Sequence, residues 1–160
     1  MNEKEILTAA LDAVTKSIEM WRWLYQHPTY SKTDYFEYKN IAYENRLLNN
    51  CYLCDFVREF SNYSIVDYFG IDALLQNHSI SNCRYCPVVW PEGHCNSHSS
   101  PYNRWAMAIC AVNEKQAAGD LLKLLYKSKR RLREAINLAA EDERRKREEI
   151  WKYASLNFLN

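Results

Sequence analysis

Cys51-Tyr-Leu-Cys54 and Cys83-Arg-Tyr-Cys86 are two Cys-x-x-Cys pairs in a chain of 160 residues, and they decide how this chain is expected to fold. A gap of two residues lets a tight turn aim both sulfurs at one ion, and two such turns complete a tetrahedral shell, most often around zinc. The 28 residues between Cys54 and Cys83 leave room for the pairs to meet around a small insert. We therefore predict a structural zinc site with the ligands Cys51, Cys54, Cys83 and Cys86, which ties distant parts of the chain together.

A fifth cysteine, Cys95, follows the second pair by nine positions, so the cluster exceeds the four ligands required. Cys95 is an alternative ligand that would replace Cys83 or Cys86, and His94 and His98 are further candidates. An iron–sulfur cluster is a weaker alternative, because the Cys-x-x-Cys-Pro run lacks the third cysteine of ferredoxin spacing. Disulfides or unliganded thiols also stay open.

The sequence predicts no catalytic residue. A closed four-thiolate site has no open position for a substrate or an activated water. Zinc deaminases need His-x-Glu ahead of Pro-Cys-x-x-Cys, and the chain has no His-x-Glu. Its three isolated glycines form no phosphate-binding loop. Cys95 beside His94 and His98 lacks the third group that would orient a nucleophile and its base. We therefore expect a protein that is not an enzyme.

The charge balance excludes two broad roles. With 21 basic and 20 acidic side chains the net charge is +1, so neither a wholesale polyanion binder nor an acidic DNA mimic is expected. The N-terminus lacks the pattern of a signal peptide, and no apolar run approaches the roughly 18 residues of a membrane span. We expect a cytoplasmic protein with reduced thiols and no membrane partner.

Few glycines and prolines predict a mainly α-helical fold, irregular and stapled by zinc. Apolar residues at spacings of three and four predict a helix over 3–26, which Asn2 caps and Pro28 ends. A second helix is expected from Ser31, with Asp34 as capping partner, to about 50, and a short third helix over 55–60. The mixed pattern of 61–82 allows a short strand or short helices, and 83–101 has the composition of a loop.

Ser100-Pro101 has the form of a helix start, and a helical pattern then continues to about Leu156. A single straight helix of that span is about 80 Å long, whereas a compact chain of this size has a radius of gyration of about 15 Å. We therefore expect a break near Gly119 or Ser128, or an arm that projects from the body. Cys110 is expected inside the helix as a buried small hydrophobe.

The C-terminal region carries two distinct charge patterns. Five cations among seven residues, Lys127, Lys129, Arg130, Arg131 and Arg133, are candidates for contact with nucleic acid or a partner, or form a solvated helix face. Acid-first pairs at four-residue spacing then support a helix over 141–149. An apolar patch from Ile150 to Phe158 is suited to docking back, dimerising or binding a partner. We predict a zinc-stapled domain over 1–126 and a charged helical arm over 127–160, either part of the same domain or an oligomerisation or partner element.

Several motifs occur in an order that resembles a family of small, largely uncharacterised bacteriophage proteins. These motifs are Met20-Trp-Arg-Trp-Leu24, His27-Pro28, Lys32-Thr-Asp34-Tyr35, the two cysteine pairs with Pro87-Val-Val-Trp90, Cys95, and Pro101-Tyr-Asn-Arg-Trp105. They span residues 18–112 and leave the charged arm outside. The resemblance implies a phage accessory protein in the host cytoplasm, and it supplies no activity.

Three functions follow as expectations. The leading one is a non-enzymatic phage protein that takes part in host takeover by binding a host bacterial protein, for example to inhibit an antiviral defence system. The second is a zinc-stabilised nucleic-acid-binding protein that uses Lys127–Arg133 with Arg84 and Arg104. The third is a sponge for a small nucleotide signal, lined by tyrosine and tryptophan.

Overall fold

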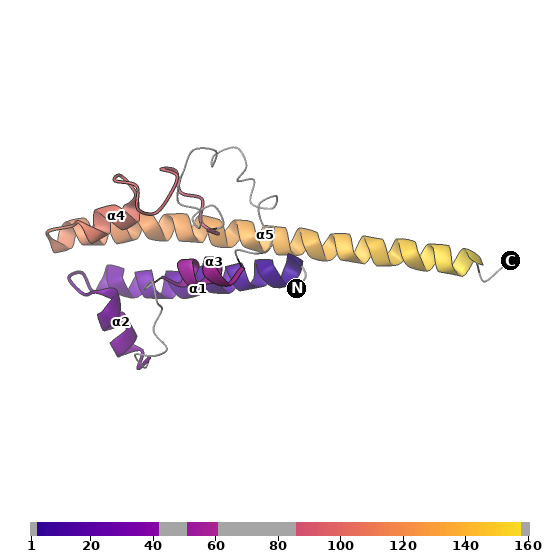
Figure 1. Ribbon diagram of the computed structural model, residues 1–160, viewed down its shortest axis with the longest axis horizontal. Coiled ribbons are helices and arrows are strands. Elements are labelled where there is room, and N and C mark those ends of the chain that lie inside the picture. Colours follow the sequence, from indigo (N-terminus) through magenta and orange to yellow (C-terminus); the bar gives the residue numbers. More distant parts are fainter. Residues whose placement is uncertain (1–2, 42–50, 61–85, 158–160) are drawn as a thin grey trace.

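The protein is mainly α-helical, as predicted. The computed structural model describes residues 3–41, 51–60 and 86–157. Within these ranges lie α1 (Glu3–Gln26), α2 (Lys32–Tyr38), α3 (Tyr52–Phe60), α4 (Pro101–Ala106) and α5 (Ala111–Asn157). The long helices α1 and α5 run antiparallel and side by side, with α3 packed on α1 and α4 on the start of α5 (Figure 1).

The apolar stripe of α1 forms one wall of the core, as its spacing predicted. Leu7, Val14 and Trp21 recur at seven-residue intervals, and each is at most 3% exposed. Tyr25, which the same pattern places on this face, is 39% exposed instead. Its ring covers Gly119 of α5, where an added Cβ would lie 3.3 Å from Tyr25 Cε2. The absent side chain at Gly119 therefore allows the end of α1 to approach α5 closely.

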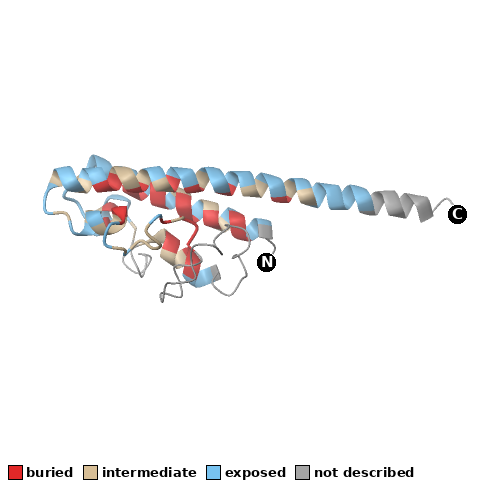
Figure 2. Ribbon diagram, turned by 90° about the horizontal axis from the view of Figure 1, so that it is seen from above, coloured by how far each residue is buried: buried red, intermediate tan, exposed pale blue. Residues whose placement is uncertain are grey.

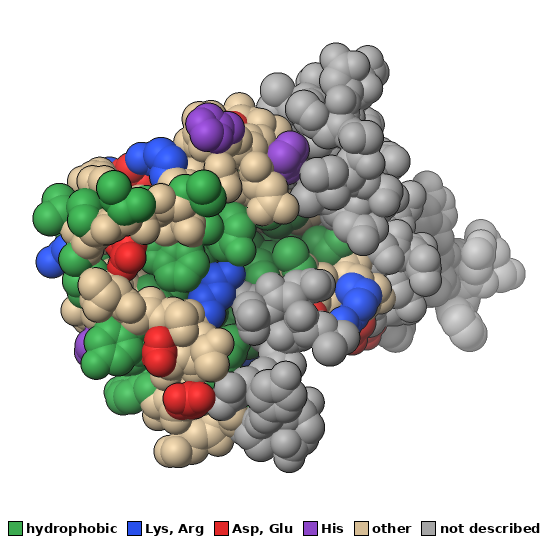
Figure 3. Space-filling model, turned by 60° about the vertical axis from the view of Figure 1, so that its left-hand side comes forward, with side chains coloured by type: hydrophobic (Ala, Val, Ile, Leu, Met, Phe, Trp, Pro, Cys, Tyr) green, Lys and Arg blue, Asp and Glu red, His purple; other side chains and the backbone are tan. Residues whose placement is uncertain are grey.

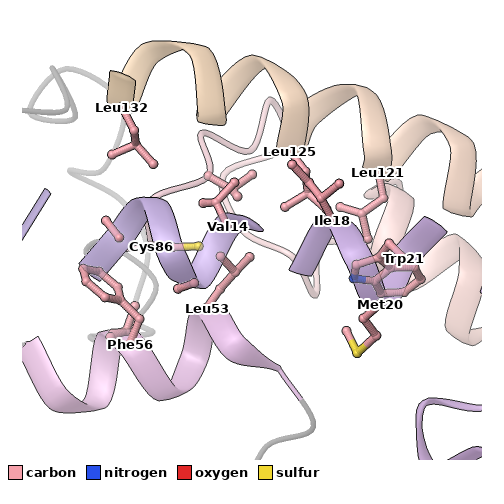
Figure 4. Close-up of a cluster of buried hydrophobic side chains, with 14 of the residues drawn as sticks. Val14, Ile18, Met20, Trp21, Leu53, Phe56, Cys86, Leu121, Leu125 and Leu132 are labelled. Atoms are coloured by element: carbon pink, nitrogen blue, oxygen red, sulfur yellow. The ribbon is translucent and has the colours of Figure 1, made fainter. Parts of the chain in front are cut away.

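The opposite wall comes from α5, whose buried positions recur at spacings of three, four and, at its far end, seven residues. This seam holds Ala118, Leu121, Leu125, Ser128, Leu132 and Ala139. Such 3–4 spacing keeps one helix face against an antiparallel neighbour over many turns. Figure 4 shows Leu121, Leu125 and Leu132 of α5 directed toward Val14, Ile18 and Trp21 of α1. The hairpin of α1 and α5 is therefore the frame on which the other described elements are mounted.

No break occurs near Gly119 or Ser128, so that part of the expectation is wrong, and α5 continues through both positions. Gly119 is tolerated because it is packed against Tyr25. The Ser128 hydroxyl donates to the Leu124 carbonyl at 3.0 Å, which satisfies the hydroxyl without interrupting the helix. The alternative expectation, a projecting arm, agrees with Figure 1, where α5 extends well beyond the start of α1.

Helix α2 begins as predicted and ends earlier than predicted. The Ser31 backbone N–H donates to the Asp34 carboxylate at 2.6 Å, and the Asp34 N–H donates to the Ser31 hydroxyl at 3.3 Å, which completes a capping box. The helix ends at Tyr38, and Asn40 adopts a left-handed φ of 52°. The expected continuation over 42–50 lies outside the described residues, as do the Asn2 cap and the segment 61–82.

Ser100 caps α4 as predicted, and its hydroxyl accepts from the Asn103 N–H at 3.1 Å. The expectation that one helix continues from Pro101 is wrong, because α4 ends at Ala106 and α5 begins at Ala111. Trp105 and Trp21 meet edge to face with ring centroids 4.9 Å apart. The turn between the helices lets α4 fold onto the hairpin and make this contact.

The turn also exposes residues that the sequence pattern placed inside. Ile109 is 95% exposed and Val112 is 76% exposed. Cys110, predicted to be buried, is exposed at the entry to α5, where its carbonyl accepts from the Glu114 N–H at 3.1 Å. Figure 3 brings this end of the molecule forward and shows hydrophobic side chains reaching the surface there.

Candidate metal centre

Cys51 occupies the N-cap position of α3. Its carbonyl accepts the first helical hydrogen bond, from the Asp55 N–H at 3.1 Å. The pKa of the Cys51 thiol is lowered to about 6, chiefly because the Cys54 thiol donates a hydrogen bond to it. The charge of Lys32 and the N–H groups of Leu53 and Cys54 lower that pKa further, against the effect of burial. A helix N-terminus favours a thiolate at this position.

The partner thiol, Cys54, has a raised pKa. It donates the hydrogen bond to Cys51, it is desolvated, and it faces the negative charge of Cys51. A cation that binds both sulfurs would displace the proton of this thiol. Cys51 and Cys54 lie on the wall of the same cavity, and their role as a pair of metal ligands stays a prediction.

The loop over 86–100 supplies Cys86 and Cys95. Gly93 makes the turn in the middle of the loop with a φ of 91°, and the Ser97 hydroxyl donates to the Glu92 carbonyl at 2.6 Å. The Ser100 hydroxyl is fully buried and donates to the Cys95 carbonyl, so the N-cap of α4 also anchors the loop. Figure 4 shows Cys86 in the core between Val14 of α1 and Leu53 of α3.

The four cysteines Cys51, Cys54, Cys86 and Cys95 line one cavity of about 410 Å³. The cavity also has Trp21, Trp90 and Tyr102 in its walls, whereas His94 and His98 do not line it. Within the described ranges, no three side chains of Cys, His, Asp or Glu are close enough as they stand to hold one metal ion. The predicted ligand Cys83 lies outside the described residues.

The donor chemistry of this cavity fits a metal such as zinc. Thiolates are soft donors, and zinc and iron–sulfur clusters are the usual occupants of all-cysteine sites. A cavity of this size exceeds the space of one ion, so binding would draw the sulfurs inward to about 2.3 Å from it. The cysteines would hold such an ion, and the ion would join α3 to the loop that leads into α4.

Lys32 is the residue of this site that the sequence patterns did not single out. It is only 6% exposed, and its Nζ lies 4.4 Å from the ring centroid of Tyr102, 5.4 Å from that of Trp21 and 5.9 Å from that of Trp105. Burial lowers the pKa of Lys32, and the thiolates of Cys51, Cys54 and Cys95 oppose that shift. The one sequence signal was the place of Lys32 in the motif order that resembles the phage family.

The predicted basic cluster lies on the surface of α5, away from the cavity. Lys127, Arg130, Arg131 and Arg133 are exposed and Lys129 is half-buried. Arg130 approaches Glu134 at 3.9 Å. Arg104, expected to act with this cluster, pairs instead with Asp120 at 3.1 Å.

Comparisons of the chain with protein-family models, curated proteins and solved structures find no match. In the part of the chain that the structure describes, no helix combines the length and apolar character needed to cross a membrane.

Proposed function

We propose that this chain is a non-enzymatic binding protein in which a metal staple rigidifies a helical hairpin and the end of α5 binds a partner protein. The resemblance described above implies that the partner is a host bacterial protein and that its antiviral defence is blocked. The metal staple is supported by the convergence of Cys51, Cys54, Cys86 and Cys95 on one cavity.

The single observation that carries the binding function is the change in α5 after Ala139. Up to that residue the seam of α5 is buried against the hairpin. The next seam positions are Asp142, Lys146 and Glu149, and of these only Asp142 is even half-buried. We call residues 141–157 the α5 extension. At 1.5 Å per residue its 17 residues project about 25 Å. Figure 2 colours the ribbon of its described residues mostly as exposed.

The α5 extension supports its own helix with ion pairs. Asp142 pairs with Lys146 at 2.8 Å, as predicted, and with Arg145 at 3.1 Å. Arg147 donates to the Glu143 carbonyl at 3.3 Å rather than to its carboxylate. These contacts lie within one helix, so they favour a preformed recognition element that loses little entropy on binding.

A charge-exchange variant tests the extension without shortening it. The variant exchanges each acid with the base four positions later: Glu141 with Arg145, Asp142 with Lys146, and Glu143 with Arg147. Its composition, net charge and paired spacing are unchanged, whereas the order of acid and base within each pair, and with it the surface charge pattern, is reversed. Tagged wild-type protein purified from infected host cells should retain a stoichiometric protein that rebinds in purified form, and the variant should lose it. Equal retention by the variant, or recovery of nucleic acid without such a protein, would refute the proposal.

Nucleic-acid binding is the second candidate, because four of the five cations in the Lys127–Arg133 cluster are exposed. It requires binding that weakens steeply with salt and that collapses when Lys129, Arg130 and Arg131 are replaced by Glu. A homo-oligomer formed through the α5 extension would appear as a concentration-dependent mass in analytical ultracentrifugation.

A further inference from the structure

We infer that Cys51, Cys54, Cys86 and Cys95 together bind one zinc ion, and that the buried ammonium of Lys32 is the counter-charge of this four-thiolate complex. This inference rests on the metal staple of the proposed function and names its ligands and its charge balance. Cys95 thereby replaces Cys83 in the ligand set.

The choice of Cys95 follows from its place in the cavity. It shares the cavity wall with Cys51, Cys54 and Cys86, so the four sulfurs come from two segments, the start of α3 and the loop over 86–100, around one space. The Cys95 backbone is fixed by the fully buried Ser100 hydroxyl, which also caps α4. A ligand at this position would couple metal binding directly to the start of α4.

The role of Lys32 follows from charge. Four thiolates around Zn²⁺ leave two negative charges, and burying an uncompensated charge is costly. Lys32 lines the same cavity, and no described carboxylate forms an ion pair with it. Arg58 also lines the cavity, but it is 54% exposed and pairs with Asp55 at 3.4 Å. Lys32 is therefore the buried cation available to the complex.

The aromatic cage explains how Lys32 is held. The rings of Tyr102, Trp21 and Trp105 surround the ammonium at 4.4, 5.4 and 5.9 Å. Aromatic faces attract a cation without supplying a negative partner. The charge of Lys32 is thus fixed in place while remaining available to balance the thiolates. Burial of the Lys32 ammonium costs solvation free energy in the metal-free protein, and the negative charge of the metal complex would offset this cost.

Single cysteine variants of the full chain test the ligand set. Elemental analysis measures the zinc content, and titration with Co²⁺ counts the bound sulfurs by their thiolate charge-transfer bands. Both measurements should show loss of metal in C95S. The variants C83S and C110S should bind as wild type does. C95H provides a second measurement that does not depend on loss of the metal. It should bind Co²⁺ with one thiolate fewer, whereas C83H should keep the wild-type spectrum. Metal loss in C83S together with wild-type binding by C95S would overturn the assignment.

Lys32→Met tests the counter-charge, and Lys115→Met is the matched control. Lys115 also contacts an aromatic ring, with its Nζ 5.1 Å from the Tyr25 ring centroid, but its side chain is exposed. Competition with a chromogenic chelator should show zinc affinity reduced about 10- to 100-fold in K32M and unchanged in K115M. The metal-free K32M protein should melt at a higher temperature than metal-free wild type, since the cost of burying the ammonium is removed. These opposite signs separate charge compensation from general damage to the fold. Unchanged zinc affinity in K32M would refute the counter-charge role of Lys32 and leave the metal site of the proposed function intact. A wild-type protein that binds no metal would refute both.

Discussion

Removal of the α5 extension should leave the folded body almost as stable as the full chain. A chain ending at Ala140 loses the described side chains of 141–149, which are all exposed except the half-buried Asp142. The ion pairs lost with them, such as Lys146–Asp142 and Arg144–Glu148, are surface pairs within one helix. Each contributes about 0.2–1 kcal/mol, mostly to the local helix. We therefore expect the free energy of unfolding of the body to change by less than about 1 kcal/mol.

Urea denaturation followed by far-UV circular dichroism and tryptophan fluorescence measures this change. With a slope of about 2 kcal/mol per M, the midpoint should move by less than about 0.5 M. The native helical signal should fall, because 17 of the 47 residues of α5 are removed. The core reporters Trp21 and Trp90 remain buried in the shortened chain.

A longer truncation provides the control. A chain ending at Arg131 also loses Leu132, which is 1% exposed, and Ala139, which is 6% exposed. Loss of one buried leucine typically costs about 2–5 kcal/mol, so this chain should be strongly destabilised. If ending at Ala140 already cost more than about 2 kcal/mol, the extension would be packed against the body, and a projecting recognition helix would be excluded.

Three further predictions concern the core, the acid response and the metal. Leu125→Ala should lower the free energy of unfolding by about 2–5 kcal/mol, because Leu125 is fully buried. In the same urea titration the control Leu138→Ala should lower it by less than about 0.5 kcal/mol, because Leu138 is 63% exposed. The pKa of Asp120 is lowered, chiefly by its hydrogen bond from Lys123 and also by the one from Arg104. The ionised carboxylate therefore stabilises the fold at pH values above the usual carboxyl pKa, and this effect is lost as the pH falls below about 4. The stability difference between wild type and Asp120→Asn, at most about 1 kcal/mol at neutral pH, should therefore shrink progressively as the pH falls below the usual carboxyl range. A difference that does not shrink with falling pH would contradict this origin. With free zinc at 100 times its dissociation constant, bound metal adds about 2.7 kcal/mol to the free energy of unfolding. Chelation should therefore lower the melting temperature by roughly 5–10 °C from that condition. Added zinc should restore the melting temperature, and added magnesium should not.

Local rules predicted those elements whose signals lie within a few residues. The apolar stripe of α1, the Ser31–Asp34 capping box and the Ser100 cap were all readable from spacing and residue type. Each depends on hydrogen bonds or burial along a single helix face, so the surrounding fold changes them little.

The boundary between α4 and α5 could not be predicted in this way. Residues 107–110, Met-Ala-Ile-Cys, contain neither glycine nor proline, and the helical periodicity of the sequence continues through them. The turn is favoured by tertiary packing of Trp105 and Tyr102 against Trp21, which a single-sequence pattern does not contain. Tertiary contacts thus override the local preference, and Ile109 and Val112 are exposed as a result.

The candidate site was predictable in its donors but not in its surroundings. Cysteine spacing indicated that Cys51, Cys54 and Cys86 would share a site, and Cys95 was retained as an alternative ligand. The burial of Lys32 depends on three aromatic rings from α1 and α4, which are separated from it by up to 73 residues. A lysine in the first turn of a short helix is normally solvated, so its sequence position alone points to the surface.

The positions of the cavity and the α5 extension determine how metal and partner binding are related. Leu125 is the last residue of α5 that lines the cavity, and Glu141 follows it by 16 residues, or about 24 Å along the helix. An ion in the cavity is thus too distant to contact the extension itself. Metal loss would reduce partner binding only by loosening the hairpin that holds the base of α5. Chelation should therefore weaken partner binding in proportion to the fraction of protein that unfolds. A loss of binding by fully folded, metal-free protein would instead place the partner contact at the cysteine loop over 86–100.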